Sequence, residues 1–232
     1  LEGFCPSFVT LEGARPRAQP APELDPSGLP EPVLPPLREA GEIVVTGIGG
    51  AGVITVGAIL GMAAHLEGRG CSVLDNTGIA RKGGAVSSHV RLAERPGELY
   101  ATHIAGGQAT LLMGGDLVVS AESATLSMLA RGRTRVVLNA DAVPTLNQRL
   151  DPMAQFDPAP LRLAIEHAVG ADAVSAVSAT RIAERLLGDA IFANMVLLGA
   201  AWQRGTIPLS RAAIEDAIDL NGNAADANRA AF

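Results

Sequence analysis

A glycine motif near residue 50 is the part of this sequence best suited to chemistry. Gly47, Gly49 and Gly52 follow the spacing Gly-x-Gly-x-x-Gly, and Gly50 adds a fourth glycine. The first glycine permits a tight turn, the second lets a phosphate approach the backbone, and the third lets a helix pack on a strand. Asp75 follows at about the place of a ribose-binding carboxylate. Taken alone, these residues indicate either a nicotinamide or flavin dinucleotide site or only a tight strand–helix junction.

A second group of candidate residues follows Asp75. Two cations precede two glycines, and two hydroxyls and an imidazole come next: Arg81, Lys82, Gly83, Gly84, Ser87, Ser88 and His89. A loop after the second strand of an α/β sheet lies at its carboxyl edge, so we expect the cations to hold an anion beside the first glycine turn. The competing interpretation is a solvated turn, with His89 as a hydrogen-bonded structural histidine. The two serines lack the Gly-x-Ser-x-Gly setting of a hydrolase.

The elements that must position these loops follow an α/β pattern, because short β-branched runs alternate with apolar residues at helical spacing. The expected strands are 43–46, 71–75, 85–92, 116–120 and 135–139, and the expected helices are 52–67, 122–130, 161–167, 178–188, 190–204 and 211–218. The first two strands and the helix between them predict a right-handed βαβ unit with parallel strands. The whole pattern predicts a Rossmann-like, doubly wound, mostly parallel sheet with a C-terminal helical cap.

Local signals refine this pattern at several element ends. Ser178 and Ser210 are expected to be helix N-caps, and Gly188 is expected to end a helix. The Gly-Gly-Asp sequence at 114–116 is interpreted as a turn that leads into a strand. Nine of the fifteen prolines fall in residues 1–40, so we expect an extended linker there, before a globular part at 41–232.

Composition argues against several functional classes. The formal net charge is −6 without a basic run, so a nucleic-acid partner is not expected. The longest apolar stretch, 191–202, is too short to span a membrane. Cys5 and Cys71 are the two cysteines and indicate neither a disulfide framework nor a metal site, so we expect a cytoplasmic setting. Charged residues make up only 18% of the chain, which favours a domain covered by neighbours.

Three stretches together resemble the gamma domain of 2-oxoacid:ferredoxin oxidoreductases, over residues 41–232. They are Gly-Ile-Gly-Gly-Ala-Gly at 47–52, Lys-Gly-Gly-Ala-Val-Ser-Ser-His-Val-Arg at 82–91, and the ending that runs from Asp-Leu-Asn-Gly-Asn-Ala-Ala at 219–225 through Asn228 to Ala231-Phe232. The leading residues 3–10 resemble the exit from the thiamine diphosphate-binding domain of fused members of the indolepyruvate type. This resemblance implies that residues 1–40 trail from such an upstream domain.

The resemblance implies a function that the chain performs only within a larger enzyme. Such enzymes decarboxylate a 2-oxoacid, here indolepyruvate or another arylpyruvate, to acyl-CoA, CO2 and reduced ferredoxin. The parent enzyme is implied to use thiamine diphosphate, Mg²⁺, 4Fe–4S clusters and coenzyme A, none of them assigned to the gamma domain. The chain alone is then expected to be inactive. It would pack against thiamine-binding domains in a homo-oligomer that donates electrons to ferredoxin.

The same resemblance bears on the site residues. The loops at 47–52 and 76–88 are expected to face the active site or the coenzyme A path, with Arg81 and Lys82 as contacts for a phosphate or carboxylate. The family loop usually has Gln where Arg81 stands. The alternatives are a free-standing NAD(P)- or FAD-binding oxidoreductase that uses Asp75, and a regulatory nucleotide-binding module.

Overall fold

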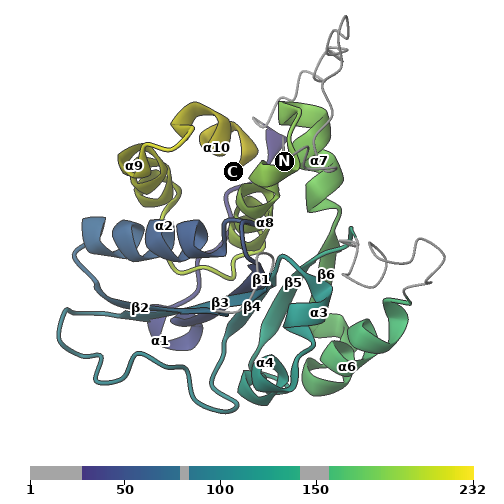
Figure 1. Cartoon of the computed structure of the whole chain (residues 1–232). Coiled ribbons are helices and arrows are strands. Elements are labelled where there is room, and N and C mark those ends of the chain that lie inside the picture. Colours follow the sequence, from purple (N-terminus) through teal and green to yellow (C-terminus); the bar gives the residue numbers. More distant parts are fainter. Residues whose placement is uncertain (1–27, 79–83, 142–156) are drawn as a thin grey trace, which may run out of the picture.

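The computed structural model describes residues 28–78, 84–141 and 157–232. They form a six-stranded sheet with helices on both faces (Figure 1). The strands are β1 (Glu42–Ile48), β2 (Gly70–Thr77), β3 (Ala85–Ala93), β4 (Leu111–Gly114), β5 (Arg135–Asn139) and β6 (Val174–Val177). The α-helices are α1 (Leu37–Ala40), α2 (Val53–Leu66), α3 (Leu117–Ser120), α4 (Ser123–Met128), α6 (Ala159–Val169), α7 (Ala179–Leu187), α8 (Ala193–Gln203), α9 (Arg211–Asn221) and α10 (Ala225–Ala231). The predicted doubly wound α/β class is confirmed.

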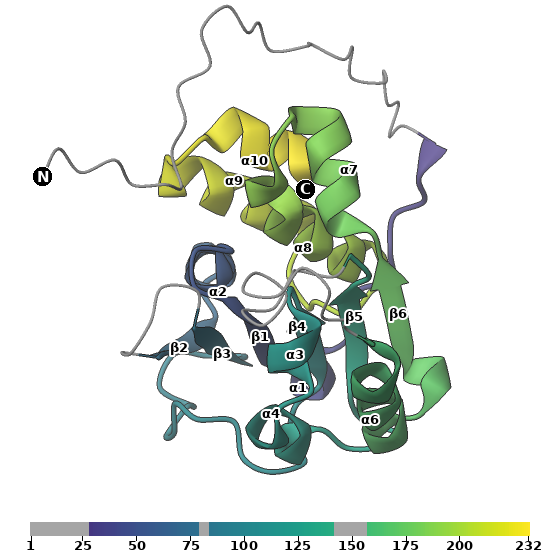
Figure 2. The ribbon, with the colours of Figure 1, turned by 45° about the vertical axis from the view of Figure 1, so that its right-hand side comes forward.

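Two hydrophobic clusters lie on opposite faces of the sheet. One is enclosed by α2 and α7 to α10, and the other by α3, α4 and α6 (Figure 2). The C-terminal helices thus cover one face of the sheet and form the helical cap that the sequence predicts. Among the residues that the structure describes, no helix has the length and apolar character that crossing a bilayer requires.

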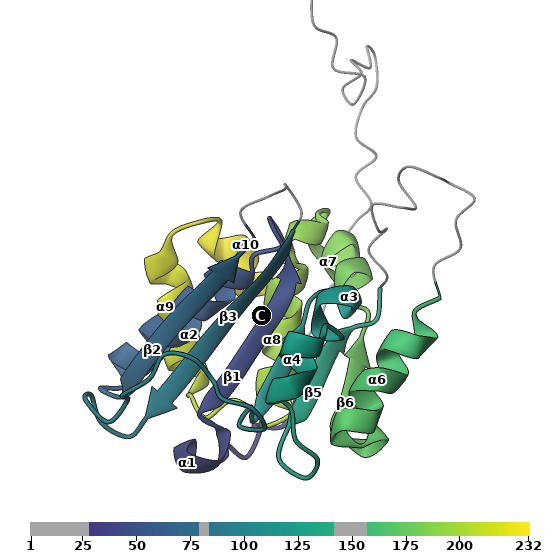
Figure 3. The ribbon, with the colours of Figure 1, turned by 60° about the horizontal axis from the view of Figure 1, so that its bottom comes forward.

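The strand order corrects the expected βαβ unit. The order is β2-β3-β1-β4-β5-β6, and β3 runs antiparallel to both β1 and β2 (Figure 3). Strands β1 and β2 therefore share a direction but do not pair, because β3 lies between them. The short connection from β2 to β3 makes antiparallel pairing the local outcome, whereas parallel neighbours need a longer crossover. Strands β1, β4, β5 and β6 are parallel to one another, and the sheet is therefore mostly parallel, as predicted.

The expected strand at 116–120 is wrong. The strand is β4, directly upstream, and the next residues form the short helix α3. The side chain of Asp116 accepts a hydrogen bond from the Val119 amide at 2.9 Å and so caps this helix. An N-cap of this kind outweighs the weak strand preference of a short β-branched run. Strand β6 and helix α10 were not predicted, since both are short.

Three predicted helix ends can be compared with the structure. The Ser210 hydroxyl accepts from the Ala213 amide at 3.2 Å, and Gly188 ends α7 with a left-handed φ of 78°, so both predictions are confirmed. Ser178 occupies the N-cap position of α7, but its side chain makes no capping bond. The Asn139 side chain, from the end of β5, accepts the Ala179 amide at 3.1 Å instead.

The expected linker is only partly described, since residues 1–27 lie outside the described ranges. The rest of it follows the surface of the domain: Gln203 donates its side-chain amide to the Pro30 carbonyl at 2.7 Å, and Leu37 of α1 is buried. Residues 28–40 therefore touch the globular part at these points, while most of their side chains are exposed.

Helix α2 packs closely on the sheet through its glycines. A Cβ at Gly57 would overlap the Ser88 hydroxyl oxygen of β3, and one at Gly61 would lie 2.9 Å from a methyl of Val73 on β2. Ser88 is fully buried, and its hydroxyl has no hydrogen-bond partner among the described residues. The absence of side chains at these two helical positions lets α2 approach the sheet.

Gly57→Ala is expected to lower the free energy of unfolding by about 1–3 kcal/mol, because overpacking outweighs the roughly 1 kcal/mol that alanine gains in a helix. The loss should be smaller in a Ser88→Ala background, where the colliding oxygen is gone. Urea unfolding of the four proteins of this cycle measures both effects. An equal loss in both backgrounds, or a gain in stability, contradicts this packing.

Candidate functional site at the carboxyl edge

The glycine turn joins β1 to α2 at the carboxyl edge of the sheet. Gly50 and Gly52 have left-handed φ values of 92° and 74°, which other L-residues rarely adopt. A Cβ at Gly47 would lie 2.8 Å from a methyl of Val53, so this glycine lets the first residue of α2 pack against the strand. Among the described residues nothing lies within 4 Å of a Cβ built on Gly50, so this part of the chain leaves its backbone uncovered.

Asn194, at the start of α8, covers the third glycine of the motif. Its Nδ2 donates to the Gly52 carbonyl at 3.2 Å, and its Oδ1 accepts the Met195 amide at 2.9 Å. A Cβ at Gly52 would overlap the Asn194 amide nitrogen. The third glycine thus makes room for a polar side chain from a distant helix. The sequence signal for this residue is a single asparagine that interrupts an otherwise apolar helix.

The second glycine loop meets the first at the same edge. The Gly49 amide donates to the Gly84 carbonyl at 2.8 Å, and the Gly78 amide donates to the Ala85 carbonyl at 3.3 Å. Arg81, Lys82 and Gly83 lie outside the described residues. One described end of this loop, Gly84, therefore contacts the glycine turn directly, whereas the other, Gly78, pairs with the start of β3.

Ser87, Ser88 and His89 do not form one site. Neighbouring residues of a strand point to opposite faces of the sheet, so Ser88 faces α2 while Ser87 and His89 face the other side. The buried His89 ring accepts the Ile104 amide at its Nδ1 at 3.3 Å and lies 4.6 Å from the His103 ring, between centroids. Burial, and to a lesser extent His103, lower the pKa of His89. His89 is thus held by contacts with residues 103–104, on the face of the sheet opposite to Ser88.

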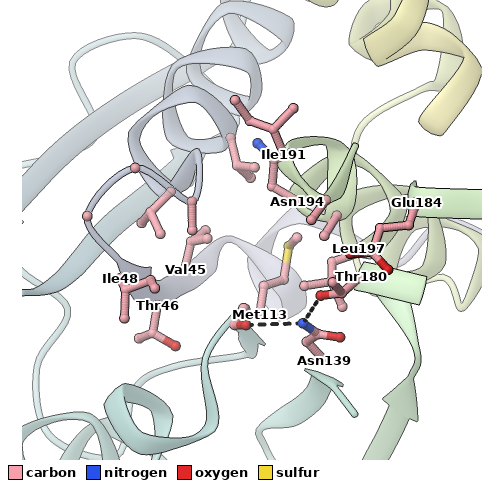
Figure 4. Close-up of a pocket in the computed structure, with 18 residues that line it drawn as sticks. Val45, Thr46, Ile48, Met113, Asn139, Thr180, Glu184, Ile191, Asn194 and Leu197 are labelled. Carbon is pink, nitrogen blue, oxygen red and sulfur yellow. Dashed lines mark hydrogen bonds between the residues drawn. The ribbon is translucent and has the colours of Figure 1, made fainter. Parts of the chain in front are cut away.

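Two cavities flank the glycine turn, with volumes of about 610 and 830 Å³. The smaller lies between the ends of β1, β4 and β5 and the starts of α7 and α8 (Figure 4). Met113 and Leu197 belong to its apolar wall, and Glu184 is its one charged side chain among the described residues. The larger lies between α2, the β2–β3 connection and the turn before α10. None of its described lining side chains is charged.

Asn139 fixes the wall of the smaller cavity. Its Nδ2 donates to the Thr180 hydroxyl at 2.8 Å and to the Gly115 carbonyl at 3.4 Å (Figure 4). Its Oδ1 accepts the Ala179 amide. Both polar atoms of this amide are therefore used, in joining β5 to the start of α7 and to the residue that follows β4. Asn139 holds the cavity wall in place and has no spare donor for a ligand.

The sequence does not fit an iron–sulfur cluster, and the described residues offer no set of ligands for a metal-bound diphosphate. A 4Fe–4S cluster takes four cysteines, whereas the whole sequence has two. The described part of the chain has no group of three or more His, Cys, Asp or Glu side chains that could hold a metal ion.

The dinucleotide alternative fits the geometry poorly. Its ribose-binding carboxylate must end the strand next to β1, but Asp75 lies on β2, and β3 separates the two. This insertion moves Asp75 one strand further, about 4.8 Å, from the glycine turn.

The family of the chain follows from comparison with known proteins. Residues 42–232 match the family model described as pyruvate ferredoxin/flavodoxin oxidoreductase, and the chain belongs to this family. The resemblance read from the three sequence stretches is thereby confirmed, and the chain is a component of an oxidoreductase of this kind.

Two relatives of the chain are named as subunits of indolepyruvate oxidoreductases. The chain is 27% identical over 192 residues to the indolepyruvate oxidoreductase subunit IorB of Methanothermobacter thermautotrophicus, a match that covers 82% of this chain and 93% of the relative. The subunit of the same name from Thermococcus kodakarensis is 27% identical over 179 residues, which are 77% of this chain and 85% of the relative.

Solved structures share the fold. The pyruvate oxidoreductase subunit PORC of Thermotoga maritima matches with a TM-score of 0.58 and 20% identity, over 82% of this chain and 92% of that one. The 2-oxoglutarate:ferredoxin oxidoreductase of Magnetococcus marinus, solved with 2-oxoglutarate, coenzyme A and succinyl-CoA, matches with a TM-score of 0.61 and 19% identity. That match covers 82% of this chain but 29% of the other, so there the fold is one part of a longer polypeptide.

The buried His89 predicts a pH dependence of stability. Because its pKa is lowered in the fold, the unfolded chain binds more protons below the ordinary value of about 6.5, and stability falls as pH drops from 6.5 through the folded pKa. His89→Asn, which keeps an acceptor for Ile104, should reduce this loss. Thermal unfolding midpoints of both proteins between pH 7.5 and 5 measure this loss of stability. Identical slopes for both proteins contradict the assignment.

Proposed function

We propose that this chain is the gamma domain of a 2-oxoacid ferredoxin oxidoreductase that acts on indolepyruvate or another arylpyruvate. The observation that carries the proposal is the family match over 42–232, joined to relatives named as indolepyruvate oxidoreductase subunits. The described site agrees, because the carboxyl edge offers backbone, amides and apolar surface rather than a set of acids, bases or metal ligands.

In this proposal the cofactors belong to partner domains, and the chain shapes their surroundings. Thiamine diphosphate, bound by a partner, supplies the carbanion chemistry, and clusters pass electrons to ferredoxin. The bare glycine turn lets a partner surface or a ligand come close to the backbone, and the apolar cavity walls help exclude water. The proposal includes residues 1–40 as a linker from an upstream thiamine-binding domain, and a cytoplasmic homo-oligomer as the assembled enzyme.

The loop that contains Arg81 and Lys82 is proposed to hold an anionic group, either a coenzyme A phosphate or the oxoacid carboxylate. Its described neighbours support this, since Gly84 contacts the glycine turn beside the larger cavity, whose described lining side chains are uncharged. A fixed cation next to an uncharged cavity would select anions.

Lys82→Ala in the assembled enzyme should raise the KM for coenzyme A or for the oxoacid about tenfold or more, as expected for loss of one charge-assisted hydrogen bond. Lys82→Arg keeps the charge and should restore most of the affinity. Steady-state kinetics with each ligand varied in turn measure the effect. Unchanged KM values for both ligands would show that Lys82 binds neither of them.

The function is tested by producing the chain with its complete enzyme and following viologen reduction that depends on both 2-oxoacid and coenzyme A. We expect turnover with indolepyruvate at a higher kcat/KM than with pyruvate or 2-oxoglutarate, and none from the chain alone. Turnover by the chain alone, or tight NAD binding that is lost in Asp75→Ala, would overturn the proposal.

A further inference from the structure

The contact between Asn194 and Gly52 joins segments 142 residues apart in the sequence. The Gly52 carbonyl already accepts the Val56 amide at 3.1 Å, the first hydrogen bond inside α2. The Asn194 amide adds a second bond to the same oxygen, from the start of α8. The first carbonyl of α2 is therefore held from two sides, by its own helix and by a side chain of another.

The oxygen of the Asn194 side-chain amide is also held by a hydrogen bond. Its Oδ1 accepts the Met195 amide, which belongs to the first turn of α8. Just upstream, the Asp189 carboxylate accepts the Ile191 amide at 2.9 Å and orders the short 3-10 turn Ala190–Phe192 that leads into α8. Asn194 thus connects the ordered start of one helix to the turn that begins another.

This contact lies where the two cavities meet. Both cavities share Asn194, Ile191 and residues of the glycine turn in their lining. The side chain over Gly52 consequently occupies the boundary between the two spaces, and the conformation of the turn determines the shape of both.

The larger cavity offers neutral polar groups and, among its described lining residues, no negative charge. Its described lining contains amides and hydroxyls, among them Thr55, Thr77, Asn223 and Asn228, but no carboxylate. The N-terminus of α2, a helix of 14 residues, borders the same cavity and carries partial positive charge from the aligned peptide dipoles. The position of Gly52 fixes where this helix begins.

We propose that Asn194 is a positioning residue for the site at the glycine turn. By holding the Gly52 carbonyl it keeps the turn and the start of α2 in the conformation that accepts an anionic group of the reactants, either a coenzyme A phosphate or the carboxylate of the 2-oxoacid. The inference rests on the proposed function, because it assigns the turn a ligand of that reaction.

The test uses the complete enzyme with three single variants. Asn194→Asp keeps the size of the side chain but replaces the donor with an acceptor facing the Gly52 carbonyl, and Asn194→Ala removes the amide altogether. Gln203→Glu is the matched control, because Gln203 also donates a side-chain amide to a backbone carbonyl, at the other end of α8. The kcat, the KM for coenzyme A and the KM for the 2-oxoacid are measured, with the thermal unfolding midpoint of each protein.

Both Asn194 variants should raise one of the two KM values about threefold to tenfold, as expected for the loss of one hydrogen bond, with a smaller change in kcat. The ligand whose KM rises is the one whose anionic group uses the site. The control should leave both KM values unchanged. In Asn194→Ala the KM should rise even where the unfolding midpoint stays near that of the wild type.

Two results overturn the inference while the proposed function stands. One is an active wild-type enzyme whose KM values do not change in either Asn194 variant. The other is a fall in kcat and in the unfolding midpoint with both KM values unchanged, which would reduce Asn194 to a packing residue. A complete wild-type enzyme that shows no 2-oxoacid-dependent turnover refutes the proposed function, and the inference fails with it.

Discussion

The insertion of β3 between β1 and β2 is the constraint on which the site depends. Because β3 runs antiparallel to both neighbours, its first residue, Ala85, lies beside Ile48 at the end of β1. The second glycine loop therefore returns to the edge where the first glycine turn begins. The bond from the Gly49 amide to the Gly84 carbonyl follows from this register.

The site formed in this way is built from backbone and amides rather than from reactive side chains. Gly50 exposes bare backbone, Asn194 anchors the turn at Gly52, and Asn139 anchors the start of α7. Such an arrangement supplies shape, hydrogen-bond donors and exclusion of water, which are the contributions that a protein makes when bound cofactors carry out the chemistry. Relatives that are named as subunits, and a solved structure in which the same fold is one part of a longer polypeptide, agree with this division of labour.

Much of the fold could be predicted from the sequence, because the spacing of apolar residues in most segments matches the helix or strand that the segment forms. Strand β5 was predicted to the residue, and Ser210 and Gly188 mark helix ends as expected. The errors arose where long-range or side-chain contacts decide. The β2–β3 pairing is a tertiary choice that periodicity does not encode, and one carboxylate, Asp116, turned an expected strand into a helix. At the site, the glycines were evident from spacing, whereas Asn194 depends on a contact that only the fold creates.

The most direct test of the account is hydrogen–deuterium exchange of the chain alone and in its complete enzyme. If the carboxyl edge faces a partner's active centre, assembly should slow amide exchange in residues 48–53 and 190–194 and at the turn before α10. Exchange in α6, which covers the face of the sheet opposite to α2 and α8, should change much less. Protection confined to α6 or to the edge strand β2, with the glycine turn unaffected, would contradict the account.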